Sequence, residues 1–192
     1  MNNTKVVIAF VAESSDLTER HWLNRYAASL APGETDGRDN IIHCECFFPR
    51  ADTRVSSKQT GQAYGIYFGG AVWRHDEKQY SNSDYIFKTV TLTPVQKKNM
   101  LQFLDKQVGK RFNHLGYASF LTPCKISGNL PGFERRFYCS QLTMAALNHS
   151  GVFAPNNMPE NIHPHRVFEL LNEISTVCSH PVRHVDYSSL TF

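Results

Sequence analysis

The chain has neither a long hydrophobic run nor a run of basic residues. Its early apolar segment, 6–12, has seven residues, well short of the ~18 that a membrane-spanning helix needs. A cleavage region is also missing, because a helix with Asp16 and Glu19 in its first turn is expected directly afterwards. We therefore expect a first buried strand and no signal peptide. Lysine and arginine are scattered and the net charge is only +3, so nucleic acid is not an expected partner.

Paired Cys-x-x-Cys spacings are absent as well. The five cysteines are Cys44, Cys46, Cys124, Cys139 and Cys178. Their number is odd, and Cys44 and Cys46 are too close in one strand to bridge each other, which favours a reducing compartment, the cytoplasm. A zinc site of His43, these two cysteines and a distant one is disfavoured, because strand alternation places His43 on the opposite face from both. We expect no metal and no cofactor.

The remaining composition is that of one globular domain spanning residues 1–192. The chain is 41% hydrophobic and 19% charged, which is ordinary for a soluble protein with one sizeable core. We expect strands at 5–12, 41–48, 62–68 and 85–92, a Gly69-Gly70 break running into 71–74, and helices at 16–30, 94–108, 138–150 and 164–174. The consecutive middle strands predict an antiparallel meander sheet packed against helices, the α+β class. Two long loops, 119–136 and 152–163, are equally consistent with the rim of a functional site and with ordinary surface loops.

Cys139 stands where a short apolar run turns into a helix. The segment 137–142 reads Phe-Tyr-Cys-Ser-Gln-Leu, apolar residues then recur at helical spacing, and Gly151 follows as a left-handed cap. A thiol in the first turn feels the positive end of the helix dipole, which favours the thiolate. This is the environment of a cysteine nucleophile. The alternative is a buried structural cysteine.

The strand expected at 41–48 carries an imidazole and a carboxylate on one face. Side chains alternate along a strand, so His43 and Glu45 project together, while Cys44, Cys46 and Phe48 project oppositely. A histidine that takes a proton from a thiol needs a polar partner to fix its tautomer and orientation. The alternative is a half-exposed edge strand with two solvated polar residues.

The order of these segments resembles the circularly permuted papain-fold enzymes of the NlpC superfamily. That group includes bacterial YaeF/YiiX-like proteins and relatives in poxviruses and other large DNA viruses. His-x-Glu on an early strand is followed by a helix begun by Thr93-Pro94, by 109–113 (Gly-Lys-Arg-Phe-Asn) and Gly116-Tyr117, and last by 137–142. In unpermuted enzymes the nucleophilic cysteine precedes the histidine; here the histidine comes first. The resemblance covers about residues 40 to 175 and implies a permuted papain-like (NlpC-type) fold.

The resemblance implies that Cys139 is the nucleophile and His43 the general base. The third member stays open: many relatives carry a glutamate on the next strand, where this chain offers only Gln62. Glu45 is the nearer carboxylate and ranks first, although two such neighbours on one strand lie ~6–7 Å apart and must lean together to touch. Tyr138 matches a position near the oxyanion pocket, with the backbone N–H of Cys139 as the natural donor.

The expected activity is that of a papain-like cysteine hydrolase, a peptidase or amidase, or of an acyltransferase. The substrate would carry an amide, isopeptide, ester or thioester bond, in a peptide or a lipid acyl chain. The alternative is a catalytically silent binding module that retains the fold. The sequence allows contact with a membrane surface without indicating it, and makes no prediction of oligomeric state. If the protein is viral, the compartment is the host cytoplasm.

Overall fold

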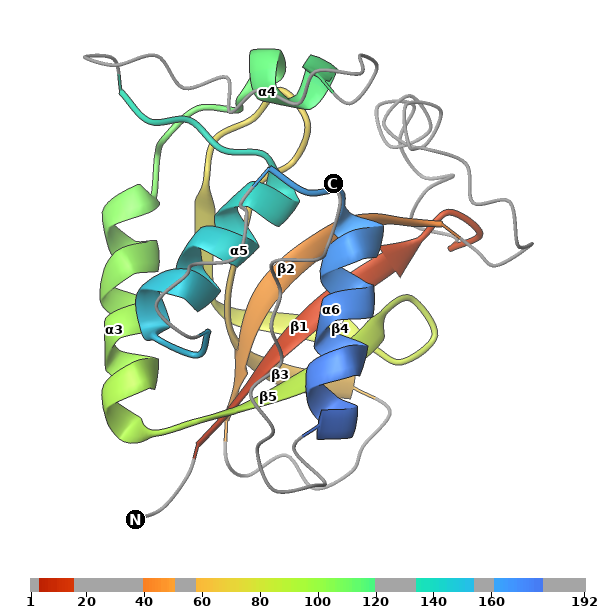
Figure 1. The fold of residues 1–192 in the computed structure, drawn as a ribbon, viewed down its shortest axis with the longest axis vertical. Coiled ribbons are helices and arrows are strands. Elements are labelled where there is room, and N and C mark those ends of the chain that lie inside the picture. Colours follow the sequence, from red (N-terminus) through yellow and green to blue (C-terminus); the bar gives the residue numbers. More distant parts are fainter. Residues whose placement is uncertain (1–3, 16–39, 51–57, 120–133, 154–160, 178–192) are drawn as a thin grey trace.

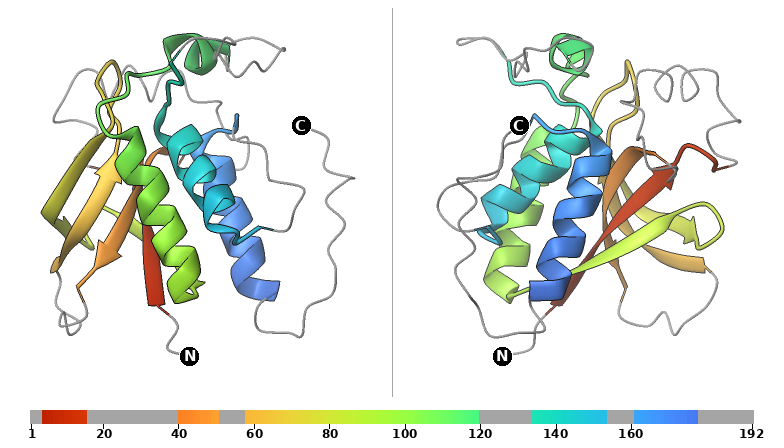
Figure 2. Two further views of the ribbon diagram at one scale, coloured as in Figure 1. Left: turned by 90° about the vertical axis from the view of Figure 1, so that its left-hand side faces the viewer. Right: turned by 45° about the vertical axis from the view of Figure 1, so that its right-hand side comes forward.

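A five-stranded antiparallel sheet with helices on one face is the framework of the protein (Figures 1 and 2). The computed structural model describes residues 4–15, 40–50, 58–119, 134–153 and 161–177. The strands are β1 (Thr4–Ala12), β2 (Ile41–Pro49), β3 (Lys58–Gly65), β4 (Trp73–Ser81) and β5 (Ile86–Leu92). They pair in the order β4-β3-β2-β1-β5. The predicted α+β class is therefore confirmed.

The helices α3 (Pro94–Gln107), α5 (Cys139–Ser150) and α6 (Pro164–Val177) lie side by side over one face of the sheet, and the short α4 (His114–Ala118) lies near one end (Figures 1 and 2). Helix α3 begins as predicted at Thr93, whose hydroxyl accepts from the backbone N–H of Gln96. Helix α5 ends as predicted at Gly151, with φ 78°. The helix expected at 16–30 and most of the two long loops lie outside the described residues. No helix in the described part of the chain is long and apolar enough to cross a membrane.

Alternation on the central strands gives the sheet two apolar faces. Phe10, Cys44 and Cys46 point toward the helices and join the main core. On the other face, Phe47 and Tyr80 belong to a second, smaller core that also contains Val7, Ala9 and Ala63. Side chains of β2 at odd positions, including His43 and Glu45, therefore lie on the face away from the helices, as alternation predicts.

The sheet curls, because strands at its two opposite edges are joined by a very short turn. β4 and β5 are the outermost strands, yet only residues 82–85 connect them. The carbonyl of Ser81 accepts from the backbone N–H groups of Asp84 and Tyr85 in this turn. The rings of Tyr80 and Tyr85 follow with centroids 4.7 Å apart. The two edges therefore approach each other at this end, and the curled sheet encloses the second core.

Three sequence expectations about the strands were wrong. β3 spans 58–65 rather than 62–68, β4 was missed apart from its start within 71–74, and the meander stops at β4, since β5 pairs with β1. The reason for missing β4 is its edge position: Tyr80 is its one buried residue, so it has no alternating apolar pattern. β3 begins with polar residues for a related reason, since it lies next to this exposed edge.

A β-bulge in β4 changes which of its side chains share a face. Gly61 pairs with Lys78 and Ala63 pairs with His75, so two residues of β4, Asp76 and Glu77, stand opposite the single Gln62. The extra residue reverses the alternation along the strand. As a result Lys78 lies on the same face as Trp73, with its Nζ 4.2 Å from the ring centroid.

Candidate active site

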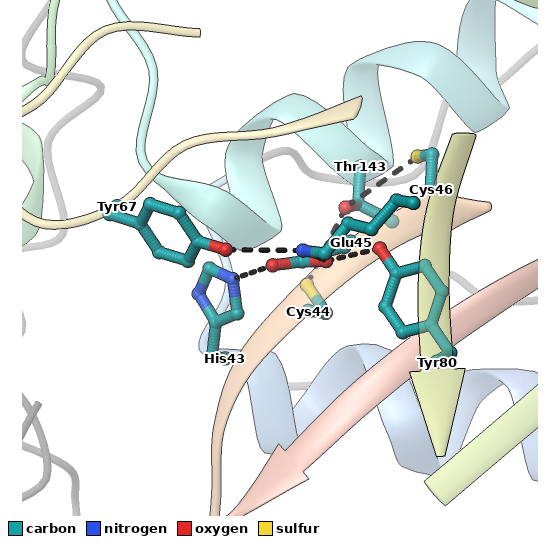
Figure 3. A network of polar contacts seen from close by, with 8 residues as sticks. His43, Cys44, Glu45, Cys46, Tyr67, Tyr80 and Thr143 are labelled. Carbon is teal, nitrogen blue, oxygen red and sulfur yellow. Dashed lines mark hydrogen bonds and ion pairs between the residues drawn. The ribbon is translucent and has the colours of Figure 1, made fainter. Parts of the chain in front are cut away.

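Helix α5 places the side chain of Cys139 against strand β2. Cys139 is the first residue of the helix and only 5% exposed. One turn later, the hydroxyl of Thr143 lies 3.5 Å from Sγ of Cys44 and 3.9 Å from Sγ of Cys46 (Figure 3). Residues four apart share a helix face, so the face that contacts β2 carries Cys139 as well. The chain thus brings its candidate nucleophile to the candidate histidine strand.

Cys139 and His43 shift each other's pKa in opposite directions. A hydrogen bond with the side chain of Cys44 lowers the pKa of Cys139 most, and the positive charge of His43 and a hydrogen bond with its ring lower it further, against the opposing effect of burial. Burial lowers the pKa of His43, but the thiolate of Cys139 and the carboxylate of Glu45 together raise it to about 9. Both shifts favour the thiolate and imidazolium forms of the pair over the neutral forms.

Glu45 holds the second nitrogen of the imidazole. Its carboxylate is completely buried, and Oε1 lies 3.0 Å from Nε2 of His43 (Figure 3). Oε2 accepts from Nζ of Lys78 at 2.5 Å and from the hydroxyl of Tyr80. Burial alone would raise the pKa of Glu45, but the bond from His43 and the charges of Lys78 and His43 bring it to about 2. Because Nε2 is engaged by Glu45, Nδ1 is the nitrogen left for the thiol.

Gln62, the alternative third member, is not brought to His43. It pairs with Phe48 in the sheet, on the face opposite to His43, and its amide donates to Asp76 at 3.1 Å. The β2–β3 register, continued past the end of β3, places Tyr67 opposite His43. The ring of Tyr67 stacks on the imidazole with centroids 5.4 Å apart and an interplanar angle of 23°.

Tyr138 lies immediately before the helix as its N-cap residue and is completely buried. Its ring contacts that of Tyr117 edge to face, with centroids 6.0 Å apart. It makes no side-chain capping bond to the first turn of α5. The first turn of a helix has N–H groups with no intrahelical acceptor, so the role predicted for the N–H of Cys139 as an oxyanion donor stays a prediction.

The two segments that carry most of the motif are tied to each other. The backbone N–H of Asn113 donates to the carbonyl of Phe137 at 2.8 Å. The side-chain amide of Asn113 donates to Oε1 of Gln141 at 3.0 Å, and its oxygen accepts from the N–H of Gly116. Asn113 and Gln141 are both buried. These bonds fix the start of α5, and with it the position of Cys139.

Sequence reasoning missed the side chains that surround Glu45 from β4 and from the segment after β3. The Nζ atom of Lys78 lies inside an aromatic cage formed by Trp73, Tyr80 and Tyr67, at 4.2, 4.8 and 5.6 Å from their ring centroids. The hydroxyl of Tyr67 also accepts from Lys78 at 3.1 Å. No sequence signal pointed to Lys78, because the bulge places it on the inner face against the alternation of the strand.

Within the described ranges, no three His, Cys, Asp or Glu side chains are grouped so that they could hold a metal ion. A surface pocket of about 560 Å³ lies elsewhere, between the end of β2 and α3, and Phe48, Gln62, Asp76 and Lys97 are among its lining residues. Its lining includes none of the side chains of the candidate active site, so we do not assign it a role in catalysis.

Comparisons of the chain with protein-family models, with curated proteins and with solved structures found no match.

Proposed function

We propose that the protein is a cysteine-dependent hydrolase or acyl transferase that acts on an amide, isopeptide, ester or thioester bond. In this proposal the chain has the permuted papain-like fold of the NlpC type. The order of elements supports it, because the histidine strand β2 precedes the cysteine helix α5 and the start of α5 packs on β2. The catalytic residues are Cys139, His43 and Glu45.

One observation carries the proposal. A buried carboxylate holds one nitrogen of His43 at 3.0 Å, and the same imidazole lowers the pKa of the thiol at the start of a helix. The charges support one another in sequence: the carboxylate stabilises the imidazolium, and the imidazolium stabilises the thiolate. A structural cysteine in an apolar core would instead have a raised pKa, as burial raises that of Cys46 to about 12.

The reaction follows from these roles. The thiolate of Cys139 attacks the carbonyl carbon, a C–S bond forms, and the carbonyl oxygen becomes an oxyanion near the first N–H groups of α5. The intermediate collapses as His43 gives its proton to the departing amine, alcohol or thiol. Water or another acceptor then loses a proton to His43 and attacks the thioester, which releases the acyl product and restores the thiolate.

A thiol-reactive acyl-mimetic probe tests the proposal. In the native protein the probe should label Cys139 selectively over the four other cysteines, as determined by peptide mass spectrometry. Denatured protein, in which every cysteine is accessible, is the control for intrinsic labelling, and Cys139→Ala is the control for site specificity. Equal labelling of all five cysteines in the native protein would instead favour a silent binding module. A panel of peptide amides, isopeptides and acyl thioesters then identifies the substrate class.

A further inference from the structure

Lys78 is a desolvated cation with one carboxylate partner in the described structure. Its side chain is 16% exposed, and its Nζ lies 2.5 Å from Oε2 of Glu45. Burial lowers the pKa of Lys78, and the carboxylate of Glu45 opposes that effect. The ring faces of Trp73 and Tyr80 stabilise the ammonium further. Burying an ammonium group in such a poorly solvated site costs free energy. Its position against Glu45 therefore calls for an explanation.

The two oxygens of Glu45 are divided between its partners. Oε1 lies against His43, and Oε2 accepts from the hydroxyl of Tyr80 (Figure 3). Oε2 also accepts from Nζ of Lys78. The bonds to Oε2 fix the rotation of the carboxylate, and that rotation directs Oε1 to the imidazole. The charges then alternate through the site: the thiolate of Cys139, the imidazolium, the carboxylate and the ammonium of Lys78.

The balance of these charges matters for the chemistry. A completely buried carboxylate with no second cation would hold the proton of His43 strongly, since opposite charges in a poorly solvated site interact far more than in water. Such an imidazolium would activate the thiol well but would return its proton slowly to a leaving group. A cation on the far oxygen of Glu45 weakens this hold.

We propose that Lys78 is a positioning residue of this site: together with Tyr80 it holds Glu45 toward His43, and its charge balances that of the carboxylate so that the imidazolium can give up its proton. This inference rests on the proposed function. The titratable groups that face Glu45 in the described residues are His43 on β2, Tyr67 after β3, and Lys78 and Tyr80 on β4, with Tyr85 behind Tyr80. Among these, Lys78 is the group that carries a positive charge besides His43.

The test replaces Lys78 by methionine, which keeps the length of the side chain without its charge. Loss of a nearby positive charge raises the pKa of both His43 and Glu45. Both limbs of the pH profile of kcat/KM should therefore move upward, the alkaline limb by about one pH unit. Lys78→Arg keeps the charge and should leave the alkaline limb in place. Arg74→Met removes an exposed cation of the same strand, paired with Asp76 and Asp105, and should move neither limb.

A second measurement needs no substrate. NMR titration of the His43 ring, and the pH dependence of alkylation of Cys139 by iodoacetamide, report the same pair directly. An upward shift of the His43 titration in Lys78→Met, absent in Arg74→Met, supports the role of Lys78 even if no turnover is ever found. If that shift is seen but no turnover is found, the proposed function fails while the inference about Lys78 is still supported.

A purely structural Lys78 would give a different result. Lys78→Met would then lower the melting temperature and leave the His43 titration unchanged, and either this outcome or a downward shift overturns the inference. If Lys78→Met does not fold, Lys78→Gln gives the same comparison, because its amide still donates to Oε2 without a charge.

Discussion

His43 lies between two negatively charged side chains, and this position explains how it titrates. The thiolate of Cys139 and the carboxylate of Glu45 both raise its pKa, to about 9, although burial opposes them. The imidazole is therefore charged before any substrate arrives. Its first task would be to stabilise a thiolate that already exists, and the transfer of its proton would come when the leaving group departs.

Replacement of Cys139 by alanine should abolish turnover and leave the fold intact. We expect a loss of on the order of a thousandfold or more, because the variant lacks the proposed nucleophile of a group of residues that would work as a unit. Cys46→Ala is the matched control: that thiol is also buried on the helix side of β2, and its loss should reduce stability more than turnover. Steady-state kinetics and thermal unfolding check both variants. Retention of most of the turnover by Cys139→Ala would rule out our assignment.

Replacement of Glu45 by glutamine should slow the reaction and move its alkaline limit to lower pH. The amide still accepts a hydrogen bond from His43 but no longer stabilises the imidazolium, so the pKa of His43 falls from about 9. The pH profile of kcat/KM measures this change. Gln62→Ala is the control and should leave the profile as it is, because Gln62 lies on the other face of the sheet. If instead Gln62→Ala moved the alkaline limb and Glu45→Gln did not, Glu45 would not be the partner of His43.

Some residues of the site could be predicted from the sequence and others could not. Alternation on one strand places His43 with Glu45, and the helix start places Cys139 in a first turn; both inferences need only local periodicity. Direct contact between His43 and Glu45 did not follow from spacing, because the two side chains must lean together along the strand to reach 3.0 Å. Lys78 required knowledge of a bulge, and a bulge depends on how two strands pair.

At the scale of elements, burial decided which strands could be predicted. β1 and β2 are covered on both faces for most of their length, so their sequences contain apolar runs that predict strands. β4 is exposed along most of its length, so its polar sequence gives no strand signal. Strands that are held mainly by pairing to a neighbour, rather than by burial of an apolar face, are the ones that pattern reasoning loses.

Gly65 is a point where two elements approach too closely for a side chain. It lies opposite Glu45 in the continued β2–β3 register. A Cβ at this position would be 2.6 Å from a ring carbon of Trp73 and 3.1 Å from Cγ of Glu45. The absence of a side chain therefore lets Trp73 pack beside the buried carboxylate.

Gly65→Ala should destabilise the protein by about 1–3 kcal/mol through overpacking, and should reduce the selective alkylation of Cys139 as Glu45 is displaced. Denaturant unfolding and probe labelling measure the two effects. The double variant Gly65→Ala/Trp73→Phe removes the ring carbon that the new methyl group meets and should regain part of the stability. An unchanged unfolding free energy in Gly65→Ala would show that the contact relaxes without cost.

For the whole molecule, His43 and Cys139 make the free energy of unfolding depend on pH in opposite directions. The raised pKa of His43 adds stability that is full below its ordinary value of 6.5 and is lost as pH rises to about 9. The lowered pKa of Cys139 adds stability that is full above its ordinary value of 9.0 and is lost as pH falls. Between 6.5 and 9 the two changes therefore oppose each other.

The acid side is governed by Glu45, whose pKa falls from 4.5 to about 2 on folding. Its contribution is present above 4.5 and is lost as pH falls from 4.5 toward 2, at roughly 1 kcal/mol per pH unit for one proton. Denaturant unfolding between pH 3 and 9 should show this loss in the native sequence and less of it in Glu45→Gln. An identical acid dependence in both proteins would mean that Glu45 does not change its protonation on folding.

Strand β4 places the site at the least protected part of the sheet. In the described structure it pairs with β3 alone, and it supplies two of the three groups that bind the carboxylate of Glu45. Hydrogen exchange in proteins shows that such outer elements open at a fraction of the free energy of global unfolding. Fraying of β4 would leave β2 and α5 joined, and would still remove Lys78 and Tyr80 from Glu45. Warming would therefore inactivate molecules that are, by most spectroscopic measures, still native.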